Sequence, residues 1–166
     1  TRARSATNAT YDFSAQASTV LNEHLYKQAS QSKFDIFLSH SFSDKEIILG
    51  VALLLEDMGY SVYLDWRDDH ELNRSSVNKK TAETLRARMS ESKCLLYAST
   101  QNSSNSKWMP WELGYKDGLD SKCAILPVLE RAYTEFKGQE YLALYPYMTI
   151  DTPKGESVEK LWVNEN

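Results

Sequence analysis

Apolar residues along the chain fall into short runs that are separated by polar segments. Five of these runs are rich in β-branched and aromatic residues and are only five to eight residues long. They predict strands at 33–39, 60–65, 93–99, 123–130 and 147–151. The central runs are apolar on both faces, which is typical of strands in a parallel sheet that is covered by helices.

Segments with apolar residues at helical spacing lie between and beside these runs. They predict helices at 14–30, 43–59, 78–92 and 156–163, and a further helix that begins in 106–118. Ser43 or Asp44 is expected to cap the helix 43–59, and Gly59 stands just past its end. Because strand and helix alternate, the pattern predicts an α/β fold with right-handed crossovers.

The first 32 residues have a different character from the rest. Residues 1–13 are polar and rich in Ala, Ser and Thr, and the helix expected at 14–30 carries Ala17, Val20, Leu21 and Leu25 on one stripe. That stripe is expected to pack on the domain, since it would otherwise be exposed. No boundary is visible further on, so the chain is divided into an extension, 1–32, and a domain, 33–166.

Composition narrows the class of protein. A chain of 166 residues with 42% hydrophobic and 25% charged residues is typical of one soluble globular domain. The net charge of −4 argues against sequence-independent nucleic-acid binding, which needs a basic surface. No apolar run approaches the ~20 residues of a membrane span, and no signal peptide opens the chain. A cytoplasmic protein that binds neither nucleic acid nor membrane is expected.

Metal sites and nucleotide loops are not indicated. Cys94 and Cys123 lie in apolar stretches and are expected to be buried thiols. The histidines, at positions 24, 40 and 70, match no zinc spacing, and the acidic loop "DWRDDHE" lacks the spacing of a calcium loop. The glycines form neither GxGxxG nor a Walker loop. We therefore expect no metal and no cofactor.

Polar and aromatic residues gather where the predicted strands end. The first strand runs into "SHSFSD", the second into "DWRDD", and the third into the loop before "SKWMPWELGYKDG". Ligands of open α/β sheets bind outside the carboxyl ends of the strands. The residues expected together at this edge are Ser39, Asp65, Trp66, Trp108 and Glu112.

Glu112 has two open interpretations, a helix-terminal carboxylate or a functional acid. A capping box needs Ser or Thr at position 109, which is Met109, so a purely terminal Glu112 would contribute only about 0.3–1 kcal/mol through the helix dipole. Trp108, four residues earlier, shares its face. Trp111 and Tyr115 are expected to pack the helix onto the sheet, whereas Phe42 could stack on a flat ring or tuck under its loop.

Together, these segments resemble the bacterial Toll/interleukin-1 receptor (TIR) domain. "FDIFLSHSFSD" and "GYSVYLD" are similar to its first two strands, and "SKCLLYAS" with "SKWMPWEL" to its third strand and WxxxE segment. The resemblance covers about residues 33–151. It implies a flavodoxin-like five-stranded parallel sheet flanked by helices, here with the additional N-terminal helix.

For many bacterial and plant members the resemblance implies cleavage of NAD+, which is a substrate and not a cofactor. The WxxxE glutamate, the catalytic residue of that group, corresponds to Glu112, and its tryptophan to Trp108. The other residues implied to line the substrate are Ser39, His40 and Asp65 by motif, and Phe42 and Trp66 by position. The loop after the second strand lacks the family's usual Gly or Pro and is longer. In receptors and adaptors this loop mediates partner contacts, so the difference argues against carrying their assembly interface over to this chain.

The function expected first is that of an NAD+ glycohydrolase or cyclase, which gives nicotinamide and ADP-ribose or a cyclic derivative in bacterial antiphage defence. Members of this kind are expected to be homo-oligomers when active. A non-catalytic TIR docking module is one alternative, although docking needs neither Trp108 nor Glu112. A nucleoside deoxyribosyltransferase-like enzyme, which shares the sheet and a catalytic Glu, is the other.

Overall fold

The computed structural model describes residues 32–69, 72, 75, 77–128 and 139–165. The chain divides into two units, Thr1–Ser32 and Lys33–Asn166. The helix predicted at 14–30, and with it almost all of the predicted extension 1–32, lies outside the described residues. The same is true of the histidines at positions 24 and 70.

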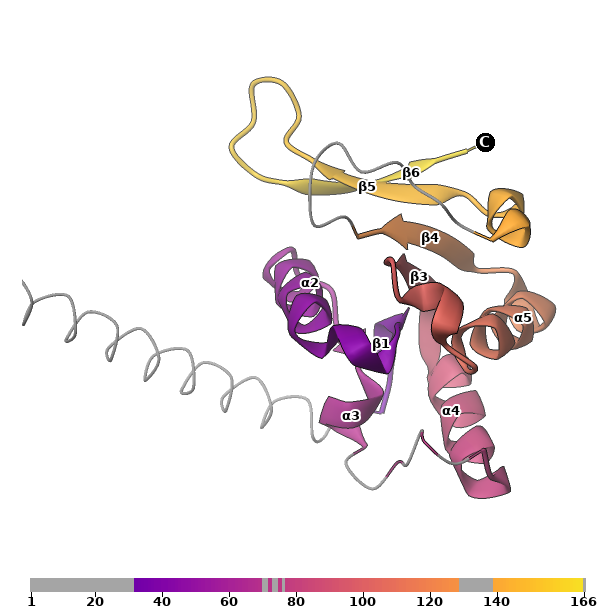
Figure 1. Ribbon diagram of the computed structural model, residues 1–166. Helices are drawn as coiled ribbons and strands as arrows, with labels where there is room; N and C mark the ends of the chain where they lie inside the picture. Colours follow the sequence, from indigo (N-terminus) through magenta and orange to yellow (C-terminus); the bar gives the residue numbers. More distant parts are fainter. Residues whose placement is uncertain (1–31, 70–71, 73–74, 76, 129–138, 166) are drawn as a thin grey trace, which may run out of the picture. The chain divides into compact units, whose positions relative to one another are not determined.

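Six strands form a single sheet in the second unit (Figure 1). They are β1 (Phe34–Ser39), β2 (Val62–Tyr63), β3 (Ser92–Ser99), β4 (Cys123–Pro127), β5 (Tyr147–Asp151) and β6 (Lys160–Asn164), in the order β2-β1-β3-β4-β5-β6. The first five run parallel to one another, and β6 is antiparallel to β5. The predicted α/β fold with a parallel sheet is confirmed, and its strand order is the flavodoxin-like one, with the topological switch point between β1 and β3.

Helices cover both faces of this sheet. They are α2 (Lys45–Asp57), α3 (Asp65–Asp68), α4 (Lys79–Glu91) and α5 (Met109–Asp120), with 3-10 turns η1 (Phe42–Asp44), η2 (Ser103–Asn105) and η3 (Glu140–Leu144). Figure 1 shows α2 on one side of the strands and α4 and α5 on the other. Because side chains alternate along a strand, Ile36 and Leu38 of β1 pack with α2 while Phe37 packs with α4 and α5.

The helix ends follow the sequence signals only in part. Asn78 accepts a hydrogen bond from the Thr81 N–H at 2.9 Å and so caps α4. Gly59, with φ of 94°, follows the end of α2 as predicted. The expected side-chain cap of α2 is wrong, because Asp44 occupies the N-cap position without a capping hydrogen bond.

The segment 156–163 was predicted to be a helix, and this prediction is wrong. Its apolar residues fit helical spacing, but Gly155, with φ of 91°, lies in the turn that brings the chain back beside β5. Five residue pairs, from Tyr147 with Asn164 to Asp151 with Lys160, then join β5 to β6 in antiparallel register. Strand pairing outweighs local propensity here. The sheet therefore has six strands instead of the predicted five.

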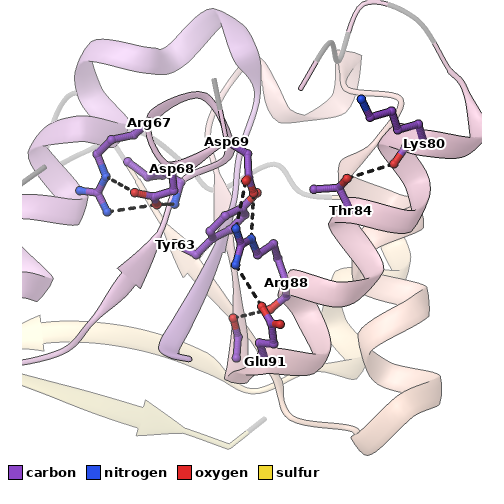
Figure 2. Close-up of polar contacts among 10 residues, drawn as sticks. Tyr63, Arg67, Asp68, Asp69, Lys80, Thr84, Arg88 and Glu91 are labelled. Atoms are coloured by element: carbon purple, nitrogen blue, oxygen red, sulfur yellow. Dashed lines mark hydrogen bonds and ion pairs between the residues drawn. The ribbon is translucent and has the colours of Figure 1, made fainter. Parts of the chain in front are cut away.

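The polar loop predicted after β2 begins as the ordered turn α3. Arg67 forms an ion pair of 2.9 Å with Glu56 of α2, and both side chains are about 4% exposed. Asp69 accepts from the Tyr63 hydroxyl at 2.7 Å and from two nitrogens of Arg88 at 2.8 and 3.0 Å. Figure 2 shows the Asp69 carboxylate pointing toward Tyr63 and the Arg88 guanidinium. The start of this loop is thus fixed to α2 on one side and to α4 on the other.

The two cysteines are free thiols. Cys123 is buried, as predicted, and burial raises the pKa of its thiol to about 12. Cys94 is only partly buried, and its thiol lies 3.4 Å from the Asp35 carbonyl oxygen. A thiol with a raised pKa is poor in the reactive thiolate, so Cys123 is expected to serve packing and not chemistry.

Candidate active site

Ser39 and Glu112 meet at the switch point of the sheet. Ser39 is the last residue of β1, and Glu112 lies in the first turn of α5. The Ser39 hydroxyl donates a hydrogen bond of 2.5 Å to Glu112 Oε2. Glu112 has an exposure of 0% and Ser39 of 1%. Glu112 is therefore not the water-facing terminal carboxylate of the first interpretation, since a buried carboxylate must be held by specific partners.

A second group of contacts forms around His40, the next residue along the chain. Its Nδ1 lies 2.8 Å from the Leu38 carbonyl oxygen, and its Nε2 lies 3.1 Å from the indole Nε1 of Trp66. A neutral ring with its proton on Nδ1 satisfies both contacts, because the indole N–H can only donate. Asp65, 3% exposed, places Oδ1 3.5 Å from the same Nε2. The structure thus brings together His40, Asp65 and Trp66, as the sequence predicts.

Trp108 lies one helical turn before Glu112, whose N–H donates to the Trp108 carbonyl at 2.8 Å. It stands at the N-cap position of α5 and is 7% exposed. Its ring packs edge-to-face on Trp111, with centroids 5.4 Å apart, and Trp111 stacks on Tyr115. Arg86 of α4 covers Trp111 at 5.3 Å. Trp111 and Tyr115 thus pack at the side of α4 and against the core cluster, in keeping with the predicted packing role.

Phe42 is 59% exposed, so the expectation that it could tuck under its loop is wrong. Its ring carries the Lys45 ammonium at 3.7 Å from the centroid, which is a cation–π contact. The same ammonium lies 5.5 Å from the Trp66 ring. Lys45 therefore connects the exposed ring of Phe42 to the His40 group.

Two residues near Glu112 were missed by the sequence reading. Tyr97 of β3 pairs in register with Ser39 and is 1% exposed. Burial raises the pKa of the Tyr97 hydroxyl, and Tyr141 and the negative charge of Glu112 raise it further. Lys116, one helical turn after Glu112, is fully buried and donates to the carbonyls of Met89 at 2.9 Å and Ser92 at 2.7 Å. Tyr97 belongs to an apolar strand pattern, so nothing in the sequence distinguishes it from a core residue. The signal that could have indicated Lys116 is its spacing of four residues from Glu112, which places both on one helix face.

Within the described part of the chain, no group of three His, Cys, Asp or Glu side chains could hold a metal ion. In that same part, no helix has the length and apolar character that crossing a membrane requires. The group at this edge of the sheet with chemistry to offer is the buried Glu112 carboxylate, which accepts from the Ser39 hydroxyl and lies one helical turn after a buried tryptophan.

The sheet has the strand order of flavodoxin, and the buried Glu112 carboxylate lies at its switch point between β1 and β3. In α/β domains with this strand order, ligands bind at that edge of the sheet. Residues 36–162 match the model of the TIR domain family. The chain belongs to that family.

Two curated relatives are similar to the chain. The chain is 48% identical over 159 residues to "Probable 3' cyclic ADP-D-ribose synthase ThsB'" of Bacillus cereus (strain MSX-D12), a match that covers 94% of this chain and 82% of the relative. It is 34% identical over 87 residues to "Putative cyclic ADP-D-ribose synthase TIR2" of Cytobacillus dafuensis, across 52% of this chain and 23% of that protein.

Proposed function

We propose that this protein cleaves the bond between nicotinamide and ribose in NAD+ and closes the remainder into a cyclic ADP-ribose, with Glu112 as the catalytic residue. The observation that carries the proposal is the buried Glu112 carboxylate at the switch point of the sheet, 2.5 Å from the Ser39 hydroxyl. The family membership and the names of both relatives support the same chemistry.

The chemistry suits a single carboxylate. When the C–N bond breaks, its electron pair leaves with nicotinamide, which departs as a neutral molecule, so no general acid is required. The ribose acquires an oxocarbenium-like positive charge, as in glycoside hydrolysis. A carboxylate beside that ring stabilises the charge, and apolar walls strengthen the interaction by excluding water. Exclusion of water also favours capture of the ribose carbon by a group of the same molecule, which yields a ring.

The neighbouring side chains have distinct roles in this proposal. Ser39 orients Glu112, and Trp108 supplies a flat apolar wall. His40, Asp65 and Trp66 line the approach to it, with Phe42 at the exposed rim. Because Glu112 is 0% exposed, the ribose reaches the carboxylate only after a neighbouring side chain moves. We infer that substrate hydroxyls then donate to Glu112 alongside the Ser39 hydroxyl, since a carboxylate can accept several hydrogen bonds.

Incubation of the purified protein with NAD+, followed by chromatography of the products, tests the function. We expect nicotinamide together with a cyclic product in equal amounts. Linear ADP-ribose as the sole product would make the protein a hydrolase. Base exchange on deoxynucleosides would favour the deoxyribosyltransferase alternative, and a folded protein inactive on both substrates would favour the docking module.

We further propose that the protein acts in the cytoplasm, in antiphage defence, as a homo-oligomer in which residues 33–166 form the TIR domain and 1–32 an extension. If neighbouring subunits complete the active site, NAD+ turnover per mole of protein should rise with protein concentration. Turnover measured over a wide dilution series, beside the molar mass at each concentration, checks this. Constant specific activity from a monomer would contradict it.

A further inference from the structure

Asp44 is a buried carboxylate that the function described so far does not use. It ends η1, five residues after Ser39, and is 5% exposed. Its Oδ2 accepts a hydrogen bond of 2.6 Å from the Thr100 hydroxyl, and its Oδ1 accepts one of 2.6 Å from the Asn102 side-chain amide. We call these three residues the Asp44 clamp. The clamp joins the segment after β1 to the segment after β3.

The two donors of the clamp are themselves held in place. The Thr100 hydroxyl also accepts from the Asn102 N–H at 3.1 Å, and the Thr100 carbonyl accepts from the Ser103 hydroxyl at 2.7 Å. Further along the same loop, Ser106 Oγ accepts from the Met109 N–H at the start of α5. Asp44 is therefore bonded to a folded loop that leads directly into the helix that carries Glu112.

The clamp joins the segments that follow β1 and β3, and the second of these segments leads into α5, which carries Glu112. Ser39 lies five residues before Asp44, and Glu112 lies ten residues after Asn102, beyond η2 and in the first turn of α5. We propose that Asp44 is a positioning residue, which holds the exit of β1 and the entry to α5 at the separation at which the Ser39 hydroxyl meets the Glu112 carboxylate. This inference rests on the proposed catalytic role of Glu112.

The chemistry of the clamp allows a sharp test. A carboxylate accepts both hydrogen bonds, whereas in Asp44→Asn only one acceptor oxygen is left, so either the hydrogen bond from Asn102 or the one donated by the Thr100 hydroxyl is lost. Asn102→Asp alone places two carboxylates against each other. The double variant Asp44→Asn with Asn102→Asp restores one amide and one carboxylate, now in exchanged positions, and leaves an oxygen for Thr100.

The experiment measures kcat and KM for NAD+ together with thermal melting, at a temperature where each variant is folded. We expect each single variant to lose about 10- to 100-fold in kcat with KM changed less than about threefold, because small displacements of reacting groups have effects of this size. The double variant should recover most of the loss. Asp57→Asn is the matched control, because it changes an exposed Asp at the other end of α2 in the same way. Its kcat and KM should equal those of the wild type. Thr100→Val keeps the shape of the side chain, removes the hydrogen bond to Asp44 together with the one from the Asn102 N–H, and serves if Asp44→Asn does not fold.

The outcomes separate this inference from the proposed function. An inactive wild type would overturn both. An active wild type with an equally active, folded Asp44→Asn variant would overturn the clamp alone, even if that variant melts at a lower temperature. A double variant that stays as slow as the single ones while folded would also overturn it, since restored hydrogen bonds would then not restore catalysis.

Discussion

Glu112→Gln is expected to lower NAD+ turnover about 100- to 1,000-fold, a loss of about 2.7–4 kcal/mol of transition-state stabilisation. The substitution keeps the size of the side chain and removes the negative charge that faces the developing ribose cation. The interaction matters more here than at the surface, because Glu112 has 0% exposure and water does not screen it. Turnover is measured by nicotinamide release under saturating NAD+.

The Glu112→Gln variant should remain folded. Glutamine keeps a side-chain oxygen that can accept the hydrogen bond from Ser39, and a neutral amide is less costly to bury than a carboxylate. Glu46→Gln is the matched control, since Glu46 also lies in the first turn of a helix that follows a strand end but is exposed. It should retain full activity. A folded Glu112→Gln protein with turnover within a few-fold of the wild type would show that Glu112 is not the catalytic residue.

Trp108→Ala is expected to cost about 3–5 kcal/mol in the free energy of unfolding and to reduce turnover as well. The indole is 7% exposed and belongs to the core cluster between the sheet and α5. Its removal leaves a cavity and breaks the edge-to-face pair with Trp111, a kind of contact that adds about 0.5–1.5 kcal/mol beyond burial. Denaturant unfolding followed by far-UV circular dichroism measures the loss.

Two further variants distinguish packing from chemistry at this position. Trp108→Phe keeps an aromatic ring and should recover part of the stability and of the turnover. Trp162→Ala removes a tryptophan of β6 that is 46% exposed and should cost far less. If Trp108→Ala proved as stable as Trp162→Ala, the indole would not be the packed wall that we describe.

Much of the fold could be predicted because the strands bury both faces. An apolar run such as 33–39 has few alternatives to a central strand, and the parallel order then brings Ser39 and Glu112 to one edge. The sequence therefore predicts that Ser39 and Glu112 lie at the same edge of the sheet. The sequence does not predict the 2.5 Å hydrogen bond between Ser39 and Glu112 or the complete burial of Glu112, because both depend on how α5 packs against β1.

The sequence-based predictions that were wrong share one physical cause, which is contact between residues far apart in the sequence. Asp44 has the position of a helix cap, but its side chain bonds to residues 56 and 58 positions later, which no local pattern reveals. The segment 156–163 has helical spacing and becomes β6 because β5 offers it a strand partner. The interaction of Lys116 with the carbonyls of Met89 and Ser92 is equally invisible in a local pattern.

The way β5 and β6 join the sheet has an energetic consequence. Five register pairs join β1 to β3 and five join β5 to β6, but a single pair, Ile125 with Tyr147, joins β4 to β5. Segments that make few contacts with the rest of a protein open more readily than its core. We therefore expect the hairpin of β5 and β6 to open before β1 and β3 do, and its amide hydrogens to exchange with solvent faster than theirs.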